Sequence, residues 1–298
     1  MKTVYYLTRR NCKLFFKDKG MFFSSLITPI ILLVLYATFL AKIYRDSFAS
    51  AVPAGLVSDA LIDATVAAQL ISSLLAVSCV TVAFCANLIS IGDKASGALR
   101  DLTVTPVKRS ALAVSYFASS AIVTLIVTVT TLAACLIYLA FVGWYMSVAD
   151  VFLLLLDVLL LTLFGTAVAS CVNFGLTTNG QASAVGTVVS AGYGFICGAY
   201  MPISNFGTGL QRVLSFLPGT YGTCLIRNHA LAGVFREMRD SAGFPEEILT
   251  GIRDSIDCNL SFFGTQVTLP AMYLILGGST LLLVGVYVLL NCLRRAGK

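Results

Sequence analysis

The sequence predicts an all-α membrane protein that forms one domain over residues 1–298, and two observations support this prediction. Of the 298 residues, 58% are hydrophobic and only 11% are charged, and the mean hydropathy is +0.90. Soluble domains carry about a quarter charged residues, so the composition excludes an ordinary soluble protein. The apolar runs are also far longer than about ten residues and do not alternate, which predicts helices rather than a membrane β-barrel.

Six segments are long and apolar enough to cross a bilayer, which takes about 20 residues. Most Lys and Arg lie in the N-terminal segment, between the second and third spans, and at the C-terminus. Most Asp and Glu lie in the other loops. The positive-inside rule therefore predicts that both termini and residues 93–109 are cytoplasmic. The predicted spans are residues 21–43, 66–91, 110–142, 151–173, 181–202 and 269–292.

The pattern of residues 1–20 predicts a separate helix that lies in the membrane surface. The stretch TVYYLTRRNCKLFFKDKG places Tyr5, Phe15 and Phe16 among Lys and Arg residues. Rings of this kind would face the lipid and the cations would face anionic headgroups. A basic flank that only obeys the positive-inside rule is the alternative.

The polar segment DKASGALRDLTVTPVKRSAL, residues 93–112, interrupts two long apolar runs. Ser96 is a candidate N-cap for a short helix. That helix would carry Leu99 and Leu102 on one side and Arg100 and Asp101 on another. A short helix that is joined rigidly to two spans is well placed to transmit an external push into them.

The end of the same segment predicts where the third span begins. Thr105 followed by Pro106 reads as an N-cap and a proline at the first helical position. The segment is therefore expected to contain a short amphipathic helix, a sharp turn and the start of a new membrane helix.

Three stretches resemble the type-two ABC permeases, a family that exports drugs, lipids and polysaccharides. The TTNGQAS turn at residues 177–183, which contains Asn179, is the weakest of the three matches. The other two are similar to the family's segments after its second span and after its fifth span. They match at Gly97, Leu99, Leu102, Thr105, Pro106 and Arg109, and then at Gly198, Pro202, Pro218, Tyr221 and Arg227.

The resemblance implies half of a transporter in a cell (plasma) membrane of bacterial type. Two permease chains, identical or different, would pair within the lipid, and each would dock a separate ATP-binding subunit that holds ATP and Mg²⁺. The substrate would be an amphipathic drug, a lipid or a peptide that moves outward, or else a polysaccharide or lipid-linked glycan. No nucleic-acid partner is expected.

The resemblance also implies that residues 93–109 form a coupling helix that enters the ATP-binding subunit, with the turn around Asn179 as a lesser contact. An ordinary cytoplasmic loop is the alternative. The implied coupling residues are Gly97, Leu99, Arg100, Asp101, Leu102, Thr105, Pro106 and Asn179.

The chain itself carries no sequence G-x-x-x-x-G-K-[ST], which a phosphate-binding loop requires. We therefore expect no enzymatic activity and no cofactor bound by this chain. Its one His and its scattered Cys do not follow a zinc or haem spacing, so no metal site is predicted. His229 is expected to be hydrogen-bonded or solvated rather than a catalytic base.

The second and fifth spans carry small residues at helical spacing, which predicts close packing between helices. The resemblance places these two spans beside a central cavity. In the second span the predicted packing seam is Ser72, Ala76, Cys79, Ala83, Ala86 and Ser90. The expected substrate contacts are Phe84, Asn87, Thr187, Ser190 and Met201, and interhelical packing is the equal alternative for each.

Asp157 is an acid well inside the fourth predicted span, and such a residue is a functional candidate by default. It suggests a proton or sodium relay, as in an ion-coupled secondary transporter. No second acid or cation is predicted within the spans, so a structural hydrogen bond is favoured instead.

Residues 203–268 are predicted to be extracellular. The resemblance implies two short re-entrant helices there, broken at Pro218-Gly219, and the polar insert that starts at Arg236 is expected to be solvated. Cys224 and Cys258 both lie in this outer segment, so a disulfide between them is a hypothesis.

Overall fold

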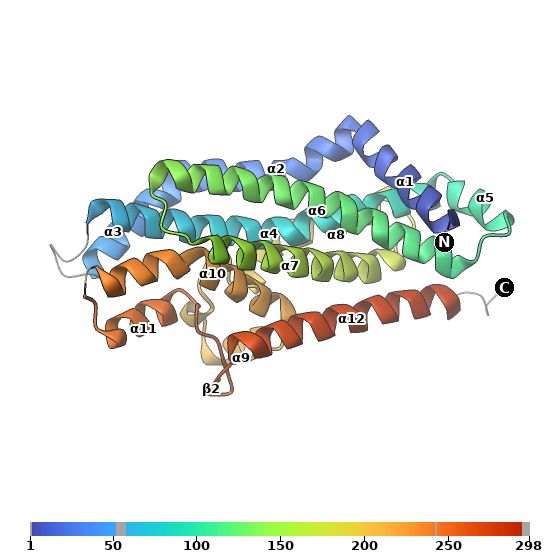
Figure 1. The fold of residues 1–298 in the computed structure, drawn as a ribbon. Helices are drawn as coiled ribbons and strands as arrows, with labels where there is room; N and C mark the ends of the chain where they lie inside the picture. Colours follow the sequence, from blue (N-terminus) through green and yellow to red (C-terminus); the bar gives the residue numbers. More distant parts are fainter. Residues whose placement is uncertain (1, 52–57, 242, 294–298) are drawn as a thin grey trace.

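The computed structural model describes residues 2–51, 58–241 and 243–293, and most of them are helical (Figure 1). The predicted all-α class is confirmed. The basic residues expected at the cytoplasmic C-terminus, 294–298, lie outside the described residues. The elements are α1 Lys2–Lys17, α2 Lys19–Leu35, π-helical η1 Tyr36–Leu40, α3 Ala41–Ala51, α4 Asp59–Ala95, α5 Ala98–Val104, α6 Arg109–Val142, α7 Val148–Phe174, α8 Asn179–Ile196, 3₁₀ η2 Ile203–Asn205, α9 Thr208–Leu214, α10 Pro218–Asp240, α11 Glu246–Ser255, β1 Ser261–Phe262, β2 Thr265–Gln266 and α12 Leu269–Leu293.

The long helices lie side by side in an elongated bundle with two distinct ends (Figure 1). The start of α1, all of α5 and the C-terminal end of α12 lie at one end, which we call the α5 end. Helices α3 and α11 lie at the opposite end, the α11 end. Segments that are far apart in the sequence therefore meet at the α5 end, where the coupling segment was predicted.

The described residues include four helices that are long and apolar enough to cross a membrane: α4, α6, α7 and α12. A fifth span results if the bent pair α1 and α2 is counted as one. Six spans are thus not confirmed. The segment expected at 181–202 forms α8, which ends at Ile196 because the chain turns at Gly198 with a φ of +73°.

The N-terminal segment forms the helix α1, which meets α2 at an angle of 74°, and its position at the membrane surface stays a prediction. Asp18 lies at this bend, and its side chain caps α2 by accepting a hydrogen bond from the Met21 amide at 3.1 Å. Helix α2 then continues through the π-helical turn η1 into α3. The first apolar run is therefore one interrupted helix.

Helix α4 is the centre of the bundle. In its most apolar stretch 89% of the residues are buried, against 28% for α6 and 17% for α12. It packs against α2, α6, α7, α8 and α10. The predicted small-residue seam is confirmed as buried, although burial extends around the whole helix rather than along one face.

The segment between α8 and α12 differs from the expected pair of short helices. The break at Pro218 is confirmed, because α9 ends at Leu214 and proline occupies the first turn of α10. Helix α10, however, is 23 residues long and mostly buried against α4, α7 and α12. The prediction that the insert from Arg236 onwards is solvated is only partly right, because Met238, Phe244 and Leu249 are buried in the core.

Candidate functional site

Helix α5 starts after a backbone turn that glycine adopts more readily than other residues. Gly97 lies between α4 and α5 and has a φ of +83°. Any other residue in this conformation would place its Cβ too close to a carbonyl oxygen. The expected cap at Ser96 is wrong, because Ser96 ends α4 and α5 has no side-chain cap. Gly97 therefore sets the direction in which α5 leaves α4.

Thr105 and Pro106 end α5 and do not begin the third long helix. The Thr105 hydroxyl donates a hydrogen bond back to the Leu102 carbonyl oxygen at 2.6 Å. Helix α6 begins at Arg109, with Lys108 in the N-cap position. The expected start at Thr105 is wrong because its hydroxyl bonds to the preceding helix.

The two predicted sides of α5 are confirmed. Leu99 and Leu102 are half-buried and pack against a cluster that contains Phe15 of α1 and Leu112 of α6. On the other side Arg100 and Asp101 are exposed, and the side chain of Val104 is 84% exposed. The leucines therefore attach α5 to its own chain, and the charged residues with Val104 form the free surface.

An ion pair fixes the end of α4 directly before α5. The Arg10 guanidinium donates to both oxygens of the Asp93 carboxylate, at 2.7 and 3.2 Å. The Tyr116 hydroxyl donates to the same carboxylate at 2.6 Å. Asp93 is buried, so this cluster joins α1, α4 and α6 in the interior. The sequence placed Arg10 and Asp93 in polar segments, but only the fold shows that they meet.

Lys94 fixes the other side of the same helix end. Its ammonium donates to the backbone carbonyls of Asn173, Phe174 and Leu176 at 2.9, 2.9 and 3.0 Å. These carbonyls belong to the last turn of α7 and to the loop that leads into α8. Asn179 is the exposed first residue of α8, next to a capping box made by Thr178. The two predicted coupling segments are thus both attached to the end of α4.

A groove of about 570 Å³ lies between α2, α4 and α8, and none of its lining residues is charged. Phe84 of α4 and Thr187 and Ser190 of α8 line it; these are three of the five predicted substrate contacts, and that role stays a prediction. Apolar groups from α2, including Ile27 and Ile31, form the facing wall. The groove therefore combines an apolar surface with hydroxyl groups.

Two expected contacts do not line this groove. The Asn87 carboxamide is buried and donates to the Ser170 hydroxyl at 2.9 Å, which joins α4 to α7. Met201 lies in the turn after α8 and is not among the residues that line the groove. Asn173 takes a place that the sequence did not indicate: it lines the groove, and its buried Nδ2 has no hydrogen-bond partner among the described residues.

Asp157 is fully buried and hydrogen-bonded on both carboxylate oxygens. His229 Nδ1 of α10 lies 2.5 Å from one oxygen, and the Tyr273 hydroxyl of α12 donates to the other at 2.5 Å. The structural hydrogen bond that was favoured for Asp157 is therefore present, and its partner His229 comes from α10, which packs beside α7. The expectation that His229 is hydrogen-bonded is confirmed.

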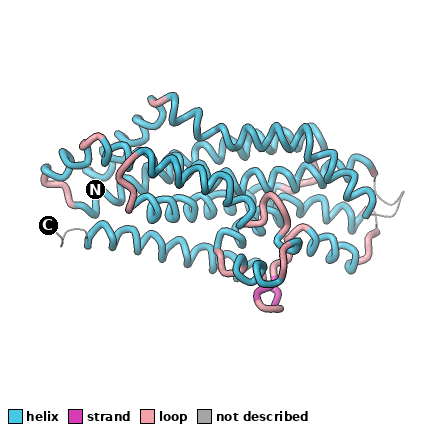
Figure 2. The backbone as a smooth tube through the Cα atoms, turned by 180° about the vertical axis from the view of Figure 1, so that it is seen from behind, coloured by secondary structure: helices cyan, strands magenta, loops and turns pink. Residues whose placement is uncertain are grey.

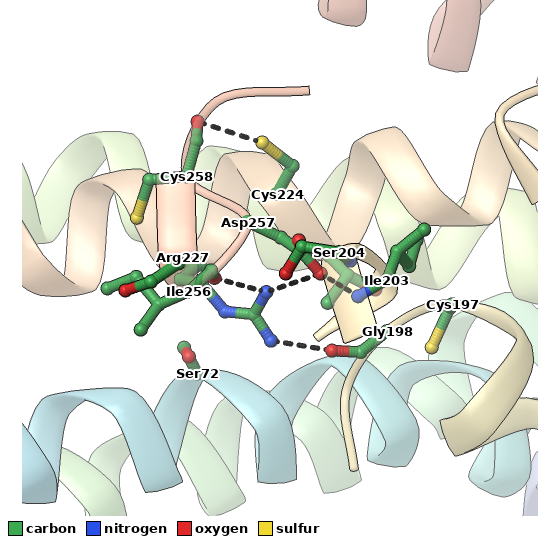
Figure 3. A network of polar contacts seen from close by, with 12 residues as sticks. Ser72, Cys197, Gly198, Ile203, Ser204, Cys224, Arg227, Ile256, Asp257 and Cys258 are labelled. Carbon is green, nitrogen blue, oxygen red and sulfur yellow. Dashed lines mark hydrogen bonds and ion pairs between the residues drawn. The ribbon is translucent and has the colours of Figure 1, made fainter. Parts of the chain in front are cut away.

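Arg227 is the largest fully buried side chain, and it joins three segments near the α11 end (Figure 3). Its guanidinium donates to the carbonyl oxygens of Gly198 and Ile256, each at 2.7 Å. It also lies 3.8 Å from the Asp257 carboxylate. The turn after α8, helix α10 and the end of α11 are therefore held together by one cation.

Asp257 extends this network to η2. Its carboxylate accepts hydrogen bonds from the backbone amides of Ile203 and Ser204, as Figure 3 shows. A Cβ added at Gly198 would come within 2.8 Å of the Ile203 side chain. Gly198 therefore allows the close approach of this turn to η2.

Cys224 and Cys258 lie next to each other and are both free thiols in the structure, and the disulfide between them stays a hypothesis. The Cys224 thiol donates to the Cys258 carbonyl oxygen at 3.2 Å. The Cys258 sulfur points away from Cys224 (Figure 3). Burial raises the pKa of the Cys258 thiol to about 12, which keeps it protonated and unreactive.

Comparisons with known proteins identify one family. A family model described as ABC-2 type transporter matches residues 2–229. The match runs from α1 into α10 and includes α5, the groove and the Asp157–His229 pair. Helices α11 and α12 and the β-hairpin lie outside it. No curated protein matches the chain.

Proposed function

This chain belongs to the ABC-2 type transporter family, and from that premise we propose that it is the permease subunit of an ATP-driven exporter. A separate ATP-binding subunit supplies ATP, Mg²⁺ and hydrolysis, because this chain contributes no phosphate-binding loop of its own. The α5 end faces the cytoplasm of a bacterial cell and the α11 end faces outward. This orientation agrees with the Lys and Arg distribution.

Helix α5 is the observation that supports coupling. Its free surface, formed by Arg100, Asp101 and Val104, contacts the ATP-binding subunit. Gly97 and the packed leucines join α5 firmly to α4, so a displacement of α5 moves the end of that helix. The Asp93 and Lys94 contacts then pass the displacement to α1, α6 and α7. Closure of the ATP-binding subunits would in this way tilt the helices that surround α4.

The uncharged groove between α2, α4 and α8 is the proposed substrate path. Its hydroxyl and apolar lining suits an amphipathic molecule such as a drug, a lipid or a peptide. Exposed apolar residues flank it on both sides, including Ile30 on α2 and Val188 on α8, which is 72% exposed. A second permease copy that packs against these residues would close the groove into a central passage.

The test of coupling is a change at the free surface of α5. Val104→Glu and Arg100→Glu should reduce the amount of ATP-binding subunit that co-purifies and should abolish vanadate-sensitive ATP hydrolysis. Leu99→Glu should do the same by detaching α5 from its own chain. Ile248→Glu on α11 is the matched control, because it makes the same change at the opposite end of the bundle. Normal docking and normal transport by Val104→Glu would contradict the proposal.

Asp157 supports a second candidate function, an ion-coupled secondary transporter. The buried Asp157–His229 pair provides the titratable groups that such a transporter needs. This candidate predicts transport without any ATP-binding subunit and loss of transport in Asp157→Asn. The permease proposal predicts no transport without the ATP-binding subunit, so reconstitution of the chain alone distinguishes the two.

A further inference from the structure

Three phenylalanine rings form an exposed cluster where α9 meets the β-hairpin. The Phe216 ring centroid lies 5.1 Å from that of Phe262 and 5.8 Å from that of Phe263. The side chains of Phe216 and Phe263 are 62% and 60% exposed. On α9, exposed Leu210 and Val213 extend the apolar surface. An exposed cluster of this kind marks an interaction site rather than an ordinary solvated loop.

The hairpin holds one of these rings in a backbone conformation that does not favour it. Phe262 pairs with Thr265, so Phe263 and Gly264 form a two-residue turn. Their φ angles are +49° and +85°. Hairpin turns with positive φ at both central residues prefer Asn and Gly, and a bulky residue there is an outlier. Asn would stabilise this turn better than Phe. We therefore infer that the Phe263 ring makes a contact outside the turn.

The cluster lies at the level where α12 enters the membrane. Helix α12 begins at Leu269, three residues after β2 ends at Gln266. Three extended residues reach at most about 10 Å, while the headgroup layer on each side of the hydrocarbon core is about 5–8 Å thick. The hairpin therefore cannot stand far above the membrane surface.

The hairpin also projects sideways from the bundle beside the start of α12, and both views show this (Figures 1 and 2). Only a small part of the apolar stretch of helix α12 is buried in the bundle, and Leu274 and Leu281 are 77% and 76% exposed. The aromatic cluster is thus continuous with the surface that α12 offers to lipid.

Arg212 places a positive charge beside the aromatic cluster. The Arg212 guanidinium lies over the Phe263 ring, 5.8 Å from its centroid. Arg212 is exposed, and among the described residues it forms no ion pair with an acid. Aromatic rings beside a free guanidinium match the boundary between acyl chains and phosphate groups.

We propose that Phe216, Phe262, Phe263 and Arg212 form an aromatic wedge that enters the headgroup layer of the phospholipid bilayer beside α12. The rings lie among the upper acyl chains, and the Arg212 guanidinium binds lipid phosphate. The wedge fixes the depth of α9 in the membrane. Helix α9 is connected through η2 to the network of Asp257 and Arg227. The wedge therefore also fixes the depth of this network relative to the lipid.

The experiment measures contact with lipid directly. The chain has one tryptophan, Trp144, so Trp144→Phe gives a background without indole emission. Phe263→Trp in this background is reconstituted into phosphatidylcholine vesicles whose acyl chains carry bromine, a contact quencher. Leu282→Trp on the exposed side of α12 is the lipid-facing control, and Ile248→Trp on α11 is the control outside the wedge.

Phe263→Trp should lose emission in brominated lipid as Leu282→Trp does, while Ile248→Trp should not. Quenching by aqueous iodide instead of brominated lipid would overturn the wedge, because the ring would then lie in water. Protection from both quenchers would overturn it as well, because the ring would be covered by a second copy or another protein. If Phe263→Trp fails to fold, Phe216→Trp at the other exposed ring gives the same readout.

Discussion

Replacing Gly97 by alanine tests whether one left-handed residue holds α5 in place. An added Cβ at Gly97 would meet no atom within 4 Å, so the change introduces no steric clash with neighbours. Its cost is the backbone conformation alone, about 1–2 kcal/mol for a residue other than glycine. Since about 1.4 kcal/mol corresponds to a factor of ten, the fraction of molecules with α5 displaced should rise about 5–30-fold.

Limited proteolysis measures this fraction without any partner subunit. Trypsin cleaves after Arg100 only when α5 leaves its packed position, and the cleavage rate follows the population of the open form when opening is fast. In membrane vesicles that expose the α5 end, Gly97→Ala should therefore be cut about 5–30-fold faster than the parent, in proportion to the conformational cost. Gly97→Asn should be cut more slowly than Gly97→Ala, because asparagine tolerates positive φ.

Gly92→Ala is the matched control for this experiment. Gly92 lies within α4, and an added Cβ there also meets no atom within 4 Å. Alanine favours a helical position over glycine, so cleavage at Arg100 should not increase. Equal cleavage rates for Gly97→Ala and the parent would refute the conclusion that the left-handed turn positions α5.

Three other changes probe the interior. Asp93→Asn removes the charged acceptor of Arg10 and should lower the free energy of unfolding by about 1.5–3 kcal/mol, measured as a lower midpoint of thermal unfolding. An unchanged midpoint would show that the ion pair does not contribute to stability. Burial raises the pKa of the Cys258 thiol to about 12, so this thiol should resist N-ethylmaleimide at pH 8 until the protein is denatured, while exposed Cys292 reacts. Peptide mapping by mass spectrometry measures the labelling of both. Rapid labelling of Cys258 would mean that it is not buried. Gly233→Ala would place a Cβ 2.2 Å from the backbone carbonyl oxygen of Tyr145 and should destabilise the fold by about 1–3 kcal/mol. Gly251→Ala is the control, because its added Cβ would meet no atom within 4 Å. Equal unfolding midpoints for the two variants would contradict the close approach of Gly233 to Tyr145.

The sequence predicted features that depend on composition and local periodicity. The all-α class and the long apolar helices follow from hydropathy, and the two sides of α5 follow from the spacing of Leu99 and Leu102. Helix caps were less predictable. Ser96 and Thr105 are both residues that cap helices, but the left-handed turn at Gly97 and the backward hydrogen bond of Thr105 decide their places.

Buried polar residues were the least predictable part. Arg227 and His229 lie in a segment that was predicted as short re-entrant helices, and hydropathy alone does not indicate that their side chains are buried. Their partners lie far away in the chain, on Gly198, Ile256 and Asp157, and no local pattern reports them. Such residues can be buried because each finds hydrogen-bond partners in the fold.

The substrate candidates show the same limit. Asn87 and Asn173 are both amides near the α5 end of long apolar helices. Asn87 is bound to Ser170, whereas the Asn173 amide faces the groove without a partner among the described residues. Which of the two amides lines the groove depends on how α8 packs beside α4 and α7, and the spacing of residues along one helix does not indicate this.

The central place of α4 has a consequence for biosynthesis. Helix α4 is synthesised before α6, α7, α8 and α10, which later cover it, so its polar side chains enter the bilayer before those neighbours exist. Five of its hydroxyl groups are already satisfied within the helix, since they donate to carbonyl oxygens of the preceding turn. A newly made α4 therefore carries little unmet polarity along its middle and can remain in the bilayer until the rest of the chain arrives. These hydroxyls belong to Thr65, Ser72, Ser78, Thr81 and Ser90.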